Sequence, residues 1–374
     1  NVMVDRFVIE RPGNVAIDIT HAPSVDDEAR ARLRVWAEAG TRDGAQLWMQ
    51  ISHAGRQSPR YATRQPFGPS AVTLDLLGSY KTPRALEEAE ILDIVQRFGA
   101  VAKIAQDCGF TGVQVHGAHG YLISSFLSPV TNRRDDRWGG PIENRARLLI
   151  ECVRAVRAQV GPGFPVSVKL NSDDFRKGGF SHADCLKVVE LLNAERIDLL
   201  EISGGTYEQP RLLGVEGRSE DAVQVRSSTR VREAYFLEYA EAIRRVATMP
   251  LMVTGGFRTR EGMETALASR ALDVIGLARP FCTHPACARE LLSHRIDRLP
   301  AFEQKLHLAP RGWRSPASPI LLMKMINVLG AQGWYYQQMD RIARGRPVDL
   351  ERGMLRSFLR YWWDDLGRAI RLKR

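Results

Sequence analysis

Two histidines and a tyrosine stand close together in the stretch VQVHGAHGYLISSFLSP at residues 113–129. His116 and His119 lie three residues apart, and Tyr121 follows two residues later. One isolated histidine is usually a satisfied core residue, but this trio at the end of one expected strand indicates a site. The histidines fit two roles. They could bind zinc with His53 or Glu201 as a third ligand, or they could hold and polarise one carbonyl oxygen as paired donors.

Tyr121 adds a proton source, because a phenol has a high unperturbed pKa and can protonate a developing carbanion. Lys169 lies at the end of another expected strand, on the same polar face as the histidines, where a cation needs an anionic partner. A flavin fits, since a cation beside its N1–C2 edge stabilises the reduced, anionic ring. Gln50 offers both a donor and an acceptor to the pyrimidine edge of such a ring.

A second group of residues fits a phosphate. VTGGF at 253–257 and GLARP at 276–280 each end an expected strand, and in barrels the loops after the last two strands commonly hold a phosphate. Gly255 and Gly256 would let backbone N–H groups approach the anion, and Arg279 would add a forked charged contact. The histidines would bind a carbonyl oxygen, Tyr121 would donate a proton and a flavin would carry a hydride. This combination predicts a reductase for electron-poor double bonds.

These residues are positioned by alternating strands and helices. Strands are expected at 45–52, 112–117, 165–171, 198–204, 250–256 and 272–280, and helices at 89–107, 142–160, 182–194 and about 236–246. Such alternation predicts an α/β fold with a parallel sheet. Each strand is apolar on one face and polar on the other. This favours a (β/α)8 barrel with a site at its C-terminal mouth over an open sheet covered on both faces.

Composition narrows the function classes. The 374 residues have no run of 18 apolar residues and no signal-peptide pattern, and the five cysteines form no C-x-x-C pair. These features predict a cytoplasmic protein without an iron–sulfur or structural zinc site. No metal is expected at the histidines either, and zinc there is the alternative interpretation. The formal net charge is +10, but most arginines alternate with acids, which is typical of solvated helix faces rather than a nucleic-acid footprint. The exception is the basic, aromatic tail RSFLRYWWDDLGRAIRLKR, which could touch a membrane surface or a partner. We favour a terminal helix that docks on the body, without stable membrane association.

Six stretches resemble the Old Yellow Enzyme family of FMN-dependent NAD(P)H oxidoreductases. They are WMQISHAGRQ, GFTGVQVHGAHGYLISSFLSPVTNRRDDRWGGPIENRARLL, VSVKLNSDDFRKGGFS, LLEISGGTYEQP, MVTGGFRTREGM and DVIGLARPF, in the family's order. The resemblance implies that FMN is the cofactor, that NADH or NADPH is the reductant, and that activated C=C bonds of α,β-unsaturated carbonyl compounds are reduced.

The resemblance also implies residue roles. Catalytic roles fall to His116, His119 and Tyr121; the flavin ring would contact Gln50 and Lys169; the phosphate would contact Gly255, Gly256, Ala278 and Arg279; His53 and Tyr207 would line the substrate pocket. The barrel would occupy residues 1–300 and a C-terminal helical extension residues 301–374. The stretch RRDDRWGG at 133–140 is expected to organise its loop rather than to take part in chemistry.

The resemblance departs at the N-terminus. Residues 1–4 look like the end of the family's second strand, so the first strand–helix unit and most of the second strand would be absent. At about 30 residues per unit, roughly 50 residues would be missing, and FMN binding by this chain is expected to be weak. Two alternatives stay open: a non-catalytic relic that binds flavin weakly or not at all, and a zinc hydrolase that uses the histidines. We also expect a small enone-like substrate and a homo-oligomer, and we expect no nucleic-acid partner.

Overall fold

The computed structural model describes residues 2–4, 15–17, 26–76, 78–205 and 239–372, which belong to two compact units. The first unit comprises Asn1–Glu208 with Ile243–Leu251, and the second comprises Gln209–Ala242 with Met252–Arg374. The predicted boundary near residue 300 stays a prediction.

The first unit is built on a parallel sheet. Its strands, in spatial order, are β8 (Leu199–Ser203), β7 (Val166–Asn171), β6 (Gly112–Gly117), β3 (Trp48–Ser52), β1 (Val2–Met3) and β2 (Val15–Ala16). β3, β6, β7 and β8 lie where the sequence pattern placed strands. β1 pairs in parallel with β3, as a short strand end at residues 1–4 would. β2 was not predicted, because two residues are too few to show periodicity.

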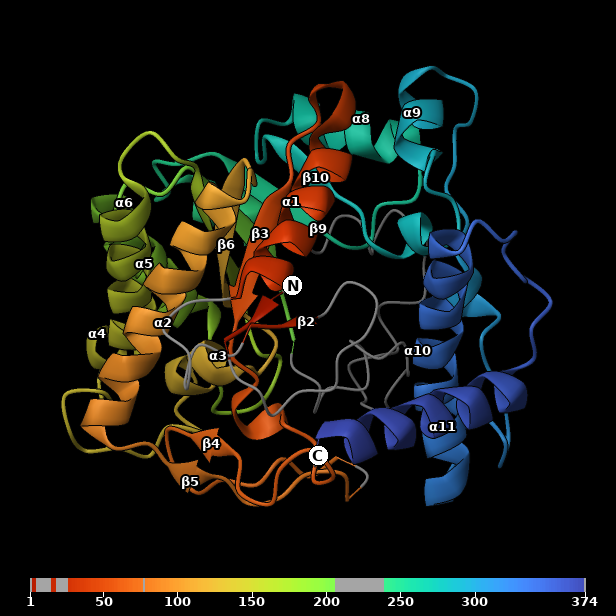
Figure 1. Cartoon of the computed structure of the whole chain (residues 1–374), viewed down its shortest axis with the longest axis horizontal. Helices are drawn as coiled ribbons and strands as arrows, with labels where there is room; N and C mark the ends of the chain where they lie inside the picture. The colour runs from red at the N-terminus through yellow and green to blue at the C-terminus, as the bar shows by residue number, and fades with distance from the viewer. Residues whose placement is uncertain (1, 5–14, 18–25, 77, 206–238, 373–374) are drawn as a thin grey trace. The chain divides into compact units, whose positions relative to one another are not determined.

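Amphipathic helices cover the apolar face of this sheet. Figure 1 shows α2 (Glu88–Asp107), α5 (Arg147–Val160) and α6 (His182–Ala194) beside the strands of the first unit, and α1 (Asp27–Thr41) precedes β3. Ser181 begins α6 with a capping box in which its side chain accepts from the Asp184 N–H and the Asp184 side chain accepts in return. The helix expected at 142–160 is instead two helices, α4 (Ile142–Arg145) and α5. They separate at Ala146, after a single tight turn that begins at Pro141.

The strand alternation places the core and the site on opposite faces. Val113 and Val115 of β6, like Val166 and Val168 of β7, are fully buried. The residue after each of these valines points to the other face, because successive strand side chains alternate. These residues are Gln114, His116, Ser167 and Lys169. Short elements complete this unit: η1 (Arg42–Gly44), η2 (Gly55–Gln57), α3 (Leu122–Leu127), and β4 (Phe67–Gly68) paired with β5 (Arg84–Ala85).

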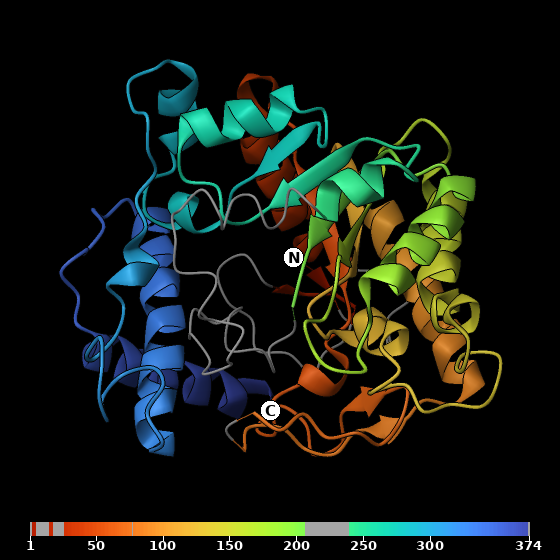
Figure 2. The same ribbon diagram turned by 180° about the vertical axis from the view of Figure 1, so that it is seen from behind.

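The second unit contains the last two strands and the C-terminal helices. β9 (Leu251–Thr254), whose first residue belongs to the first unit, pairs in parallel with β10 (Val274–Gly276), and α8 (Arg260–Ala268) connects them. η4 (Arg279–Cys282), α9 (Cys287–Leu292) and η5 (Phe302–Gln304) follow. The long helices α10 (Leu321–Ala343) and α11 (Met354–Leu372) pack across each other, as Figures 1 and 2 show. Of the helix expected near 236–246, residues 239–244 are helical.

The predicted α/β class, with a parallel sheet whose longer strands alternate with helices, is therefore confirmed. None of the described helices combines the length and the hydropathy that spanning a bilayer requires.

Candidate active site

A continuous row of polar side chains crosses the polar face of the first unit's sheet. Gln50 Nε2 donates to Gln114 Oε1 at 2.7 Å, and Gln114 Nε2 donates to Glu201 Oε2 at 2.9 Å. The other oxygen of Glu201 accepts from Lys169 Nζ at 2.7 Å. One hydrogen-bonded row thus joins β3, β6, β8 and β7 and orients both residues expected at a flavin ring.

Strand register explains why these four side chains meet. Gln50 lies opposite Gln114 in the β3–β6 pair, and Lys169 lies opposite Glu201 in the β7–β8 pair. The sequence argument required an anionic partner for Lys169, and the structure supplies one inside the sheet. Glu201 was considered at the sequence level only as a zinc ligand. Its position opposite the inward-facing Lys169 is the signal that would have identified the pair.

His116 and His119 lie together at the C-terminal end of β6. Their ring centroids are 5.3 Å apart, and the Tyr121 ring centroid is 5.0 Å from that of His116. His116 Nδ1 accepts a long hydrogen bond from the Ala118 N–H at 3.4 Å, so the proton of a neutral His116 ring resides on Nε2. His119 Nε2 lies 2.7 Å from Ser203 Oγ at the end of β8. The three predicted catalytic side chains are therefore neighbours.

The backbone after β6 is bent sharply to present these side chains. His119 has φ of 62° and Gly120 has φ of 79°, both in the left-handed region. The Gln57 side chain donates to the His119 carbonyl at 2.6 Å, and the His119 N–H donates to Asn171 Oδ1 at 3.2 Å. Side chains from η2 and from the end of β7 therefore hold the unusual conformation of His119, which is a form of local strain found at functional sites.

Electrostatics keeps both imidazoles neutral. Burial, the neighbouring His119 and the Lys169 ammonium hold the pKa of His116 well below its usual value. Burial and Lys169 lower the pKa of His119 to about 3. At neutral pH each ring therefore carries one N–H, which is the form that can donate to a carbonyl oxygen.

His53 lies just beyond β3 and is buried. Its Nδ1 accepts from the Gly55 N–H at 3.0 Å, and its carbonyl accepts from the Leu122 N–H, the residue after Tyr121, at 3.1 Å. These bonds tie the end of β3 to the start of α3. The predicted substrate contact of His53 stays a prediction, and Tyr207 lies outside the described residues.

In the second unit the predicted phosphate residues follow two paired strands. Gly276 lies opposite Thr254 in the β9–β10 pair, so Gly255 and Gly256 begin beside the segment that leads to Ala278 and Arg279. Gly255 has φ of 113° and Gly256 has φ of 86°. A Cβ on Gly255 would meet no atom within 4 Å, so the backbone there is open to an approaching group.

Arg279 is half-exposed and has an acidic neighbour that the sequence did not indicate. Its Nη1 lies 3.8 Å from Glu303 Oε1, and Arg258 pairs with the same carboxylate at 2.5 Å. Burial favours a raised pKa for Glu303, but the two guanidinium groups outweigh it and lower that pKa. Glu303 thus orients two arginines beside the β9–β10 strand ends.

The loop that contains RRDDRWGG is held by its own side chains. Asn132 Nδ2 donates to the carbonyls of Phe126 and Trp138 at 2.8 Å each. Arg134 Nη1 donates to the Leu86 carbonyl at 2.7 Å, and Trp138 is buried. These contacts support the expected organising role. Across the described ranges, no three His, Cys, Asp or Glu side chains come together as a set of metal ligands.

Comparison with known proteins places this geometry in context. The model of the NADH:flavin oxidoreductase / NADH oxidase family matches residues 18–298. An NADH-dependent flavin oxidoreductase of Neonectria sp. (strain DH2) is 37% identical over 302 residues, which are 76% of this chain and 39% of that protein. One of Talaromyces variabilis is 32% identical over 366 residues, covering 89% of this chain and 85% of that protein. The chain thus spans less than half of the first relative and most of the second.

Solved structures show the same fold. The old yellow enzyme homologue from Zymomonas mobilis superposes with a TM-score of 0.63 at 25% identity, over 81% of this chain and 80% of that one. A 2-naphthoyl-CoA reductase in complex with 2-naphthoyl-CoA gives a TM-score of 0.67 at 26% identity, over 79% of this chain and 44% of that one.

Proposed function

Because the chain belongs to the NADH:flavin oxidoreductase / NADH oxidase family, we propose that it is an FMN-dependent enzyme that uses NADH or NADPH to reduce activated C=C bonds of α,β-unsaturated carbonyl compounds. Family and relatives confirm the expected kinship with Old Yellow Enzyme and the expected pairing of FMN with a nicotinamide reductant. The type of reduction, the substrate class and the residue roles are our proposal.

The observation that carries the proposal is the cluster of two neutral histidines and a tyrosine beside the Lys169–Glu201 pair. His116 and His119 have depressed pKa values and lie 5.3 Å apart between ring centroids. Two neutral imidazole N–H groups suit one carbonyl oxygen, which gains negative charge as the double bond is reduced. A zinc site is the weaker interpretation, because Glu201 is already engaged by Lys169 and Gln114.

The residues present fit a flavin phosphate and ring. The left-handed backbone at Gly255 and Gly256 is open to an anion, with Ala278 and Arg279 following the neighbouring strand. Gln50 and Lys169, both held by the polar row, would contact the ring. Bound FMN would accept a hydride from NADH or NADPH and pass it to the β-carbon of the enone.

The chain's own side chains would complete the reaction. His116 and His119 would bind the carbonyl oxygen and stabilise the charge that develops on it. Tyr121 would give its phenolic proton to the α-carbon and regain a proton from solvent. The overall change consumes one NAD(P)H, one proton and one enone, and it yields NAD(P)⁺ and the saturated carbonyl compound.

The variant Tyr121→Phe tests the proposal. We expect NADH to bleach the flavin of this variant at the wild-type rate, whereas reoxidation by cyclohexenone slows by about 10²- to 10⁴-fold, because only the second half-reaction needs the proton. Stopped-flow absorbance measures both rates, with Tyr336→Phe on α10, whose ring stacks with that of Tyr361, as the matched control. A colourless wild-type protein that NADH does not change would favour the non-catalytic relic, and an unchanged reoxidation rate would remove Tyr121 from the mechanism.

A further inference from the structure

Helix α11 has three distinct faces. Met354, Phe358, Tyr361 and Ala369 are buried. On this side α11 packs on α10, where the Tyr361 ring stacks with Tyr336 and the Ser357 carbonyl accepts from Gln337. The sequence analysis expected such docking of the tail. The structure adds that docking uses only part of the helix surface.

A second face is apolar and exposed. Six large side chains form it, and Trp363 is 67% and Leu359 is 54% exposed. At 100° per residue the six fall within a sector of about 100° that runs the length of the helix. They are Leu355, Leu359, Trp362, Trp363, Leu366 and Ile370. We call this set the apolar stripe. Monomeric proteins rarely leave such a continuous apolar surface without a binding role.

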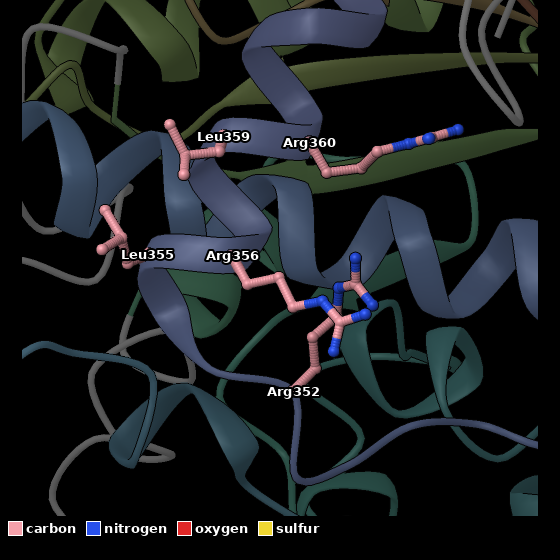
Figure 3. A pocket seen from close by; sticks show the side chains of 5 residues that line it. All are labelled: Arg352, Leu355, Arg356, Leu359 and Arg360. Carbon is pink, nitrogen blue, oxygen red and sulfur yellow. The ribbon is translucent and has the colours of Figure 1, made fainter.

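A third face, next to the apolar stripe, is basic. Arg356 and Arg360 lie four residues apart on α11 and line a surface hollow with Leu355, Leu359 and Arg352. Arg352 precedes the helix and is bonded to Gln337 and Asp349, and Arg360 pairs with Asp364 on its own helix at 3.0 Å. Figure 3 shows the two leucines pointing to one side of the helix and the arginines to another. Residues 352–374 contain seven basic and two acidic residues, a net of +5, which is half of the chain's formal charge of +10.

From this arrangement we propose that α11 binds an anionic membrane surface, lying in the plane of the headgroups with its apolar stripe inserted and its arginines on lipid phosphates. An apolar sector that contains tryptophan and leucine, next to a row of basic residues, is the pattern of in-plane amphipathic helices. Binding would be peripheral and reversible, which is distinct from a membrane-spanning anchor.

Charge argues against a second copy of the chain as the occupant. A two-fold interface pairs a surface patch with the same patch of the partner, so it would bring two copies of this segment, each with a net charge of +5, against each other. An anionic lipid surface instead attracts the exposed Arg356 and Arg360, by about 1 kcal/mol each near the surface. The apolar stripe also argues against nucleic acid, because phosphate recognition has no use for six exposed hydrophobic side chains.

Vesicle co-sedimentation of the full chain with FMN tests the proposal. We expect binding to vesicles of phosphatidylcholine mixed with phosphatidylserine, weak binding to phosphatidylcholine alone, and release by salt. Tryptophan fluorescence should shift to shorter wavelength on binding, as Trp362 and Trp363 leave water.

Two variants separate the charged and apolar contributions. Arg356→Glu with Arg360→Glu should lower the partition coefficient roughly tenfold or more, and Leu359→Asp should abolish the fluorescence shift. Arg32→Glu and Leu292→Ser, at exposed sites on α1 and α9, are the matched controls. Equal binding to both vesicle types, no binding to either, or a dimer that Leu359→Asp dissociates would overturn the proposal.

Discussion

Glu201 shows how one side chain can set the electrostatics of the whole site. Its carboxylate is buried and accepts from both Lys169 and Gln114. A buried cation beside a flavin favours the anionic reduced ring, and a carboxylate at 2.7 Å from that cation opposes the effect. If Lys169 contacts the flavin as we propose, Glu201 offsets the positive charge that Lys169 would place beside the ring.

The variant Glu201→Gln tests this balance. Glutamine keeps an oxygen for Lys169 and removes the negative charge, so we expect the midpoint potential of bound FMN to rise by about 30 mV or more, equivalent to about 1.4 kcal/mol for a two-electron couple. Anaerobic titration against a reference dye measures the potential. Glu151→Gln on α5 is the control, and a fall in potential would show that Glu201 does not act through charge.

The depressed histidine pKa values predict how stability depends on pH. An unfolded histidine has a pKa near 6.5, whereas the folded His119 has a pKa of about 3. Between these values the unfolded chain binds more protons, so the free energy of unfolding falls as pH falls, by up to about 1.4 kcal/mol per pH unit for each such histidine. Above about pH 6.5 the histidine is neutral in both the folded and the unfolded chain, so this loss of stability is absent.

Replacing His119 should reduce this dependence. Asparagine tolerates the left-handed backbone at φ of 62°, so His119→Asn should lose less stability than wild type between pH 7 and pH 5. Urea unfolding at the two pH values measures the difference. The control is His294→Asn, at an exposed position with φ of 57°. An equal loss in His119→Asn and wild type would contradict the depressed pKa.

At the scale of elements, the sequence predicts the helices and strands whose apolar residues recur at a regular spacing. The strands at 112–117 and 165–171 and the helix at 89–107 agree with the structure within one residue, because their apolar spacing is strict. The break at Ala146 was not predicted, because both halves of that segment continue the same apolar face. The partner of Lys169 was also missed, because strand register, which pairs it with Glu201, is a long-range property.

The contact between α10 and α11 depends on two glycines. A Cβ on Gly333 would lie 2.6 Å from Tyr361 Cβ and 3.0 Å from the Ser357 carbonyl oxygen, and a Cβ on Gly330 would lie 3.0 Å from the Met354 carbonyl oxygen. Gly333→Ala should therefore force the helices apart and destabilise the second unit by about 1–3 kcal/mol.

Gly367 of α11 provides the matched control. A Cβ there would meet no atom within 4 Å, so Gly367→Ala should be neutral or stabilise the helix by up to about 1 kcal/mol. Thermal unfolding followed by circular dichroism compares the two variants. If both shift the unfolding midpoint equally, close helix packing at Gly333 is not what the substitution disturbs.

At the scale of the whole molecule, family membership and site geometry support the proposed chemistry by separate routes. The family match covers residues 18–298 and rests on the sequence. The polar row and the neutral histidines rest on strand register and burial, which no motif states. Neither route assigns a role to α11, whose exposed apolar stripe lies beyond the matched residues.

Removal of the cofactor distinguishes flavin chemistry from metal chemistry in the whole protein. Within the described part of the chain, no three metal-ligating side chains converge. If the proposed flavin chemistry holds, a chelator should leave NADH consumption unchanged, and removal of FMN should abolish it, with recovery when FMN is returned. Because a ligand that binds only the folded state stabilises it by mass action, FMN at 100 times its dissociation constant should add about 2.7 kcal/mol to the free energy of unfolding. Riboflavin, which lacks the phosphate, is the control, and it should stabilise less if Gly255, Gly256 and Arg279 hold that group. Loss of activity with the chelator would contradict flavin chemistry without a metal. Equal stabilisation by riboflavin would contradict the assignment of these three residues to the phosphate.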